Sequence, residues 1–131
     1  MIEKILVPTD GSDLSKKAAK KAIELAKGLD AEIIVTNIMD QKATIPYDEQ
    51  EKRAHEYVQE IIDMAVAEDV KTSSMIIFGS PNYDIMTVTL KSEADMIVIG
   101  THGNTGLKSS IIGSFAQATL KNVDLPILLV K

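Results

Sequence analysis

Short apolar runs and longer amphipathic stretches alternate along the whole chain. The runs are rich in β-branched residues, are too short for buried helices, and lack the strict alternation of a strand with one solvated face. They are typical of strands in a parallel sheet that is covered on both faces. The sequence therefore predicts five strands, at residues 4–8, 31–39, 72–79, 94–100 and 126–131.

The amphipathic stretches between these runs predict four helices. Serine, proline and acidic residues open them, as is usual for helix starts. The third stretch contains "IMTVTL" (85–90), whose β-branched residues would also suit a strand. The predicted helices run from Ser12 to near Gly28, from Asp48 to about Ala67, from Ser80 with Pro81 in its first turn, and over 114–123.

Strands that alternate with helices predict an α/β fold with right-handed crossovers. We expect an open five-stranded parallel sheet sandwiched by helices, in the common order 3-2-1-4-5. Such sheets bind ligands at the carboxyl ends of strands, where the strand order reverses. Two polar, glycine-bearing loops, "PTDGSD" (8–13) and "GTHGNTG" (100–106), should then face one crevice.

The second loop has the features of a phosphate cradle. Gly100 ends a strand where a side chain would block a ligand, and Gly103 allows a positive φ, so that N–H groups can converge on an anion. Nine residues later, Gly113 and Ser114 open the last helix, whose first N–H groups and dipole attract anions. The spacing matches neither the Walker A motif nor the dinucleotide fingerprint. A turn-forming connection is the alternative interpretation.

Two polar side chains in these loops are candidate ligand contacts. Asp10 is either a pocket-lining group opposite the second loop or a turn residue before a helix. His102 lies inside the cradle and is either a donor to a phosphate or a solvated turn residue. The pattern predicts no catalytic residue and no metal ligand, because one Asp and one His are too few groups to indicate a catalytic site.

Composition narrows the possible functions. With 131 residues, 45% of them hydrophobic, the chain suits a single domain over 1–131. It has no cysteine, which excludes disulfides and cysteine-built metal or redox sites and fits a cytoplasmic protein. A net charge of −5, scattered basic residues and 4% aromatic residues argue against nucleic-acid binding. No apolar stretch approaches the length that spans a membrane.

The sequence resembles the universal stress protein family over nearly its entire length. The family's nucleotide-binding members carry glycine, two residues, glycine, nine residues, and then glycine followed by serine or threonine. Gly100, Gly103 and Gly113–Ser114 have that spacing. The segments "KILVPTDGS", "GSPNYDI" and "LPILLVK" also follow the family's order. The resemblance implies a Rossmann-like, adenine nucleotide alpha hydrolase-like fold that binds ATP, and a homodimer joined through the C-terminal strand.

The resemblance also implies roles for individual residues. Gly100, Gly103, Gly113 and Ser114 would hold the phosphates and ribose, and Phe115, where the family usually has a smaller apolar residue, would contribute its backbone N–H. The loop after the first strand would supply Pro8, Thr9 and Asp10, with Asp10 near the adenine or ribose. Ile38 would line the adenine. The connection after the second strand is shorter here than in many members of the family.

Three functions remain open on this evidence. The leading hypothesis is a non-catalytic ATP-binding module of a stress response, in which the nucleotide biases loop order and partner choice. The second is a slow ATPase or phosphotransfer protein that uses bound Mg-ATP. The third is a dimeric interaction domain without nucleotide, which the intact glycine spacing argues against.

Overall fold

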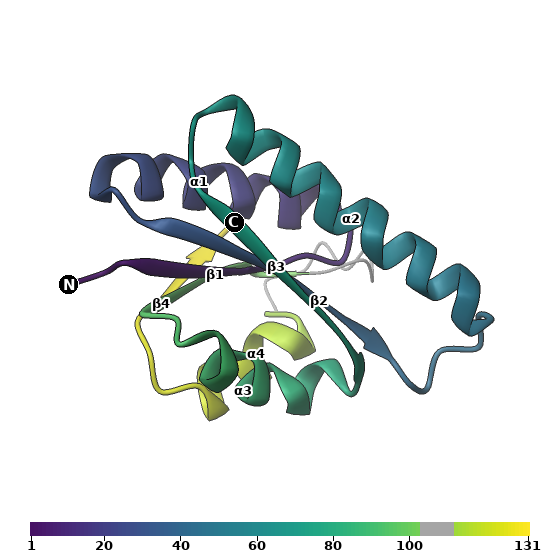
Figure 1. Ribbon diagram of the computed structural model, residues 1–131. Helices are drawn as coiled ribbons and strands as arrows, with labels where there is room; N and C mark the ends of the chain where they lie inside the picture. Colours follow the sequence, from purple (N-terminus) through teal and green to yellow (C-terminus); the bar gives the residue numbers. More distant parts are fainter. Residues whose placement is uncertain (103–111) are drawn as a thin grey trace.

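The computed structural model describes residues 1–102 and 112–131, and contains the predicted parallel sheet (Figure 1). The strands pair in parallel in the order β3-β2-β1-β4-β5, which confirms the predicted order. The strands are β1 (Lys4–Pro8), β2 (Glu32–Asp40), β3 (Thr72–Gly79), β4 (Met96–Gly100) and β5 (Ile127–Val130).

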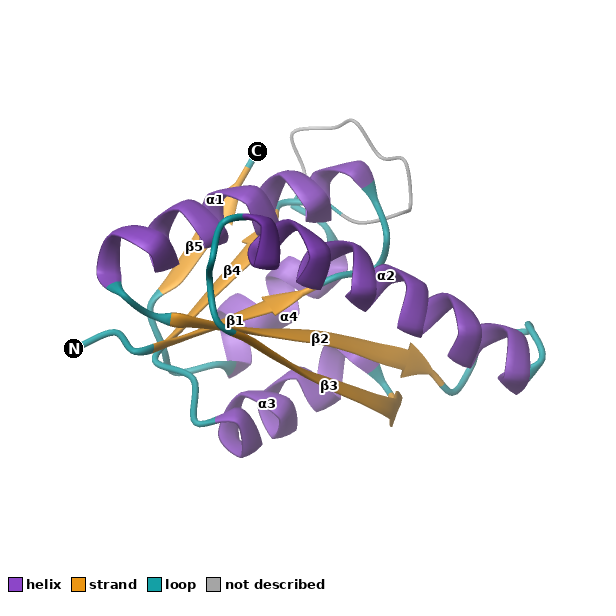
Figure 2. Cartoon of the chain, turned by 45° about the horizontal axis from the view of Figure 1, so that its top comes forward, coloured by secondary structure: helices purple, strands orange, loops and turns teal. Residues whose placement is uncertain are grey.

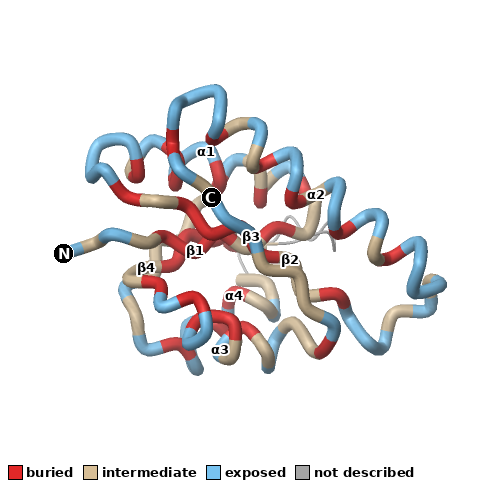
Figure 3. Tube along the Cα trace, viewed as in Figure 1, coloured by how far each residue is buried: buried red, intermediate tan, exposed pale blue. Residues whose placement is uncertain are grey.

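Helices cover the two faces of the sheet in pairs (Figures 1 and 2). On one face lie α1 (Asp13–Leu29) and α2 (Tyr47–Ala67), and on the other lie α3 (Pro81–Ser92) and α4 (Ser114–Asn122). Each pair encloses its own apolar core against the sheet. The buried residues in Figure 3 accordingly follow the strands and the inner sides of the helices. Within the described residues, no helix is both long and apolar enough to cross a membrane.

The ambiguous segment 85–90 is helical and lies in the middle of α3. Ile85 and Val88 are fully buried there, in the core between α3, α4 and the sheet. The hydroxyl of Thr89 donates to the carbonyl of Ile85 at 2.7 Å, which is a bond that helical spacing permits. Packing of one apolar face therefore outweighs the strand preference of the β-branched residues.

The helix ends differ slightly from the predicted ones. Gly28 lies inside α1, and the left-handed residue that ends the helix is Asp30, at φ 54°. Asp69 and Glu93 adopt the same left-handed conformation just after α2 and α3. Helices that cross back over a parallel sheet end beside the strands' amino ends, so these three acidic residues lie at that end of the sheet.

The pairing between β1 and β4 ends before the carboxyl ends of the two strands. The N–H of Thr9 donates to the carbonyl of Thr36 in β2 at 2.9 Å. Because the backbone groups of successive strand residues point to opposite sides, the backbone nitrogen of the preceding residue, Pro8, faces β4. Proline has no N–H to donate. The pairing of β1 with β4 stops at Leu6 and Ile97, whereas pairing with β2 continues to Pro8. Backbone groups at the carboxyl ends of β1 and β4 are thus left out of this pairing, at the point where the strand order reverses.

Asp95 lies just before the amino end of β4, and its carboxylate should make the stability of the fold depend on pH. Its carboxylate accepts hydrogen bonds from the N–H groups of Glu3 and Lys4 at 2.9 and 3.0 Å, and these bonds hold its pKa below the ordinary value of 3.8. A lowered pKa stabilises the fold above the unfolded-state pKa, and the contribution disappears as pH falls through the folded-state pKa. We expect Asp95→Asn to be less stable than the wild type at pH 7, with the difference shrinking below about pH 4. Urea unfolding of both proteins at pH 7 and below about pH 4 measures this difference in stability. A difference that does not change with pH would contradict the prediction.

Candidate functional site

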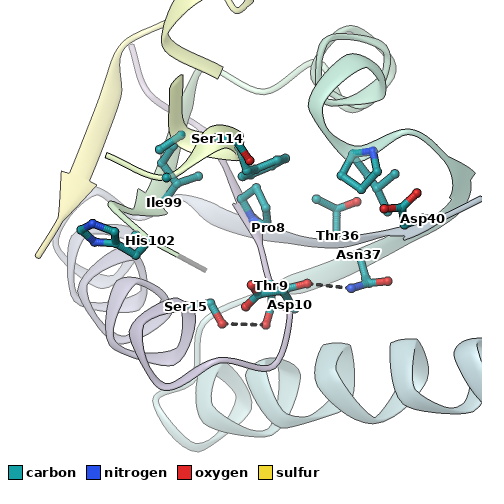
Figure 4. Close-up of a pocket in the computed structure, with 16 residues that line it drawn as sticks. Pro8, Thr9, Asp10, Ser15, Thr36, Asn37, Asp40, Ile99, His102 and Ser114 are labelled. Atoms are coloured by element: carbon teal, nitrogen blue, oxygen red, sulfur yellow. Dashed lines mark hydrogen bonds between the residues drawn. The ribbon is translucent and has the colours of Figure 1, made fainter. Parts of the chain in front are cut away.

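A cavity of about 350 Å³ lies at the carboxyl ends of β1, β2 and β4, next to the start of α4 (Figure 4). Every predicted site residue that the structure describes lines this cavity, and Gly103 lies outside the described residues. The predicted residues in the lining are Pro8, Thr9, Asp10, Ile38, Gly100, His102, Gly113, Ser114 and Phe115.

The loop after β1 is held by its own side chains. The Asp10 carboxylate accepts a hydrogen bond from the N–H of Ser12 at 3.0 Å, and the Thr9 hydroxyl accepts one from Gly11 at 3.2 Å. The Asn37 side-chain amide, on β2, donates to the Thr9 carbonyl at 2.8 Å. Ser12 also caps α1 by accepting from the N–H of Ser15 at 3.1 Å. These bonds fix the position of Asp10 relative to both β2 and α1.

Gly11 is the residue on which this loop turns. Its φ of +80° lies in the left-handed region, which L side chains rarely adopt. A Cβ on Gly11 would also lie within 2.8 Å of the ring of Tyr57 in α2. Both conformation and close packing therefore require glycine here.

Packing gives Gly100 a reason to be glycine that adds to the ligand approach predicted from the sequence. A Cβ at this position would lie 2.9 Å from Cγ and 3.3 Å from Cδ2 of Leu14, which is in the first turn of α1. The absence of a side chain on Gly100 thus lets α1 pack closely against the end of β4. Gly100 still contributes backbone to the cavity lining.

The first turn of α4 forms the end of the cavity where an anion would be favoured. Gly113 is the N-cap residue in an extended conformation, and as a glycine it provides no side chain to cap the helix. The N–H of Gly113 donates to the Thr101 carbonyl at 2.7 Å, so Gly113 itself holds the helix start in place. Helix geometry leaves the next N–H groups, beginning with Ser114 and Phe115, without partners inside the helix. Together with the helix dipole they attract negative charge.

His102 lies at one end of the cavity lining and Asp40 at the other (Figure 4). The imidazole Nδ1 of His102 is 2.9 Å from the hydroxyl of Thr101, which is itself buried. The N–H of Thr101 donates to Val130 of β5 at 3.0 Å. His102 therefore stands on a segment that is tied to the last strand.

Several lining residues were missed by the sequence analysis. Most come from the end of β2 or from helix starts, and the predicted strand order places all of these segments around the end of β1. Ser15 helps to hold the loop in place. Its hydroxyl donates to the Ser12 carbonyl at 2.8 Å and lies 3.2 Å from the Thr9 hydroxyl. The missed residues are Ser15, Thr36, Asn37, Asp40, Pro81, Ile99 and Ala116.

The charges around the cavity are unevenly distributed. Asp10 and Asp40 place two carboxylates in the lining, and its described part contains neither lysine nor arginine. Backbone dipoles at the start of α4 are therefore the main attraction for an anion among these residues. Over 1–102 and 112–131, no group of three or more His, Asp or Glu side chains is arranged to hold a metal ion.

The chain is similar in sequence to several proteins of one family. The model of the universal stress protein family matches residues 1–131. Universal stress protein MJ0531 of Methanocaldococcus jannaschii is 34% identical over 141 residues, which cover all of this chain and 83% of that protein. Universal stress protein MJ0577 of the same organism is 28% identical over 157 residues, which cover all of this chain and 96% of that protein.

Solved structures share the fold. The structure of MJ0577 has a TM-score of 0.90 at 25% identity and covers 100% of this chain and 96% of its own. A universal stress protein in complex with cAMP has a TM-score of 0.77 at 23% identity, covering 99% and 97%. One from Archaeoglobus fulgidus in complex with dAMP has a TM-score of 0.80 at 19% identity, covering 100% and 98%. From its match along the full sequence and its fold, this chain belongs to the universal stress protein family.

Proposed function

We propose that this protein is a cytoplasmic ATP-binding module that acts in a stress response without catalysing a reaction itself. The observation that carries the proposal is a single cavity that joins the reversal point of the sheet to the start of α4, where the N-cap residue is a glycine. Parallel α/β sheets bind their ligands at this point, and helix starts bind phosphates.

The apolar part of the cavity suits a nucleobase. Ile38 and Phe115 line the cavity and also pack against the core beneath α3 and α4. Pro8 lines the cavity beside them. A flat aromatic base buries its faces on such side chains, while Asp10 offers acceptor oxygens to ribose hydroxyls. We assign the adenine to this apolar part and the ribose to the neighbourhood of Asp10.

The phosphates belong at the start of α4 in this proposal. Gly113 presents no side chain there, and the Ser114 hydroxyl and the N–H groups of Ser114 and Phe115 are available donors. Gly100 and His102 line the same cavity. Gly103 completes the phosphate site in the proposal because its spacing from Gly113 matches the nucleotide-binding members of the family.

Related structures support an adenine nucleotide as the ligand class. The complexes with cAMP and with dAMP both contain adenine nucleotides and share this fold. ATP is the specific ligand that the glycine spacing favours. A bound magnesium ion would then be carried by the phosphates, as is usual for ATP.

We further propose that the protein is a homodimer joined through β5. This strand is the last of the sheet, so its outer edge has no pairing partner within the described chain. All four of its residues are only partly buried. An unpaired edge is a liability that pairing with a second copy removes, and two-fold symmetry closes the assembly.

Native mass spectrometry of the purified protein tests the ligand and the dimer together. We expect a dimer mass that carries one ATP per chain, and denaturation should release the nucleotide for identification. Release of ADP, with turnover of added ATP, would instead support the alternative of a slow ATPase or phosphotransfer protein.

If no nucleotide co-purifies, thermal unfolding with added ATP decides the proposal. ATP at 100 times its Kd should stabilise the fold by about 2.7 kcal/mol. For a chain of this length this raises Tm by about 10 °C. No shift at millimolar ATP would rule out the proposed function.

A further inference from the structure

Helix α2 contributes no residue to the described lining of the cavity, yet two of its side chains contact segments that do. The Gln50 side-chain amide donates to the carbonyl of Asp40 at 2.8 Å. The ring of Tyr57 packs on Gly11, next to Asp10. Gln50 and Tyr57 are two turns apart and lie on the same side of α2. This side of the helix therefore touches the cavity segments after β1 and at the end of β2.

The contact between Tyr57 and Gly11 leaves no room between ring and backbone. An ideal Cβ on Gly11 would lie 2.5 Å from Cδ1 and 2.8 Å from Cζ of the ring, and closer still to Cε1. The ring carbons thus occupy the side of Gly11 where any other residue would carry its side chain. The ring blocks movement of the loop toward α2.

The helix that carries the ring is docked firmly against the rest of the fold. Val58 and Ile61, which follow Tyr57 in α2, are 3% and 0% exposed in the core beneath α1 and α2. One turn after Tyr57, Glu60 pairs with Lys16 of α1 at 3.0 Å. The loop thus packs against a side chain whose helix backbone is fixed by buried residues and by this ion pair.

Asp10 depends on the peptide that Tyr57 covers. Its carboxylate accepts from the N–H of Ser12, so the Asp10 side chain spans Gly11. If Gly11 moved, this bond and the cap of α1 at Ser12 would loosen together. Asp10 lines the cavity, whereas Tyr57 does not.

We propose that Tyr57 is a positioning residue for the nucleotide site, which acts through Gly11 to hold Asp10 in its ligand-binding position. The inference rests on the proposed function, since it concerns the affinity of that site for ATP. The contact uses ring carbons, so the aromatic ring rather than the hydroxyl carries the role. Without the ring, binding must also order the loop, and ordering backbone costs conformational entropy.

The experiment compares ATP affinity by calorimetry in Tyr57→Ala, Tyr57→Leu and Tyr57→Phe. We expect about a tenfold weaker Kd in Tyr57→Ala and Tyr57→Leu, equivalent to about 1.4 kcal/mol. Tyr57→Phe should restore the wild-type value within about twofold, because it keeps the ring. Tyr47→Ala is the matched control: Tyr47 lies in the first turn of the same helix, and its ring packs on Phe78. Its Kd should stay within about twofold of the wild type.

Amide hydrogen exchange without nucleotide provides a second measurement. The N–H groups of Gly11 and Ser12 should exchange faster in Tyr57→Ala than in Tyr57→Phe, while those of β1 stay unchanged. A folded Tyr57→Leu with wild-type Kd and unchanged exchange at Gly11 would overturn the inference. If the wild type bound no ATP, the proposed function would fail, and the exchange data alone would decide whether Tyr57 positions the loop.

Discussion

Gly113→Val should lower the affinity for ATP at least about a hundredfold, equivalent to about 2.7 kcal/mol, while the protein stays folded. The backbone of Gly113 is extended, at φ −61° and ψ 158°, a conformation that valine adopts readily. Valine also keeps the N–H that donates to Thr101 and the carbonyl that accepts from Gln117. The isopropyl group would stand before the first N–H groups of α4. Hydrogen bonds from such groups to a charged ligand contribute about 1.5–3 kcal/mol each.

Calorimetric titration with ATP measures this effect, and thermal unfolding shows whether the variant is folded. Gly28→Val is the matched control, because a Cβ at Gly28 meets nothing within 4 Å and the residue lies in α1, outside the cavity lining. We expect wild-type affinity in that variant. An unchanged Kd in folded Gly113→Val would exclude the start of α4 as the phosphate site.

Gly11→Ala should lower the free energy of unfolding by about 2–5 kcal/mol. The left-handed conformation at φ +80° costs an L residue about 1–2 kcal/mol. The new Cβ also overlaps the ring of Tyr57, and overpacking of this kind costs about 1–3 kcal/mol. Urea unfolding in the absence of nucleotide measures the loss.

Gly28→Ala serves as the control for Gly11→Ala. It makes the same change inside α1, at a position where a Cβ meets no atom within 4 Å. That variant should gain about 0.5–1 kcal/mol, because alanine is the better helix former. Gly11→Ala with a stability within about 0.5 kcal/mol of the wild type would mean that the loop can relax away from Tyr57.

The strand order and much of the cavity lining could be predicted, because the strands and the glycine-bearing loops have patterns local to the chain. Continuous apolar runs such as "ADMIVIG" identify buried parallel strands, and the order then brings Asp10 and Gly113 to one cavity. Asp40 and Asn37 lie at the end of β2 and follow from the same order. They were missed because single polar residues at the end of a strand do not form a recognisable binding motif.

Contacts between elements distant in sequence could not be predicted. Nothing in "TDGSD" indicates that Tyr57 packs on Gly11, because the pairing depends on how α2 crosses the sheet. The packing reason for glycine at position 100 was likewise hidden, since Leu14 meets it only after α1 docks. The end of α1 near Gly28 could be predicted, but the left-handed residue could not, because glycine usually adopts that conformation whereas here Asp30 does.

The left-handed residues Asp30, Asp69 and Glu93 make the amino end of the sheet a place where substitution can stabilise the fold. Each adopts a conformation that glycine adopts at lower cost, and each places a negative charge near the negative end of a helix dipole. None of the three lines the cavity. Glycine at these positions would therefore be expected to raise the stability of the fold without changing the cavity lining. Such substitutions would offset destabilising changes made around the cavity at the carboxyl end.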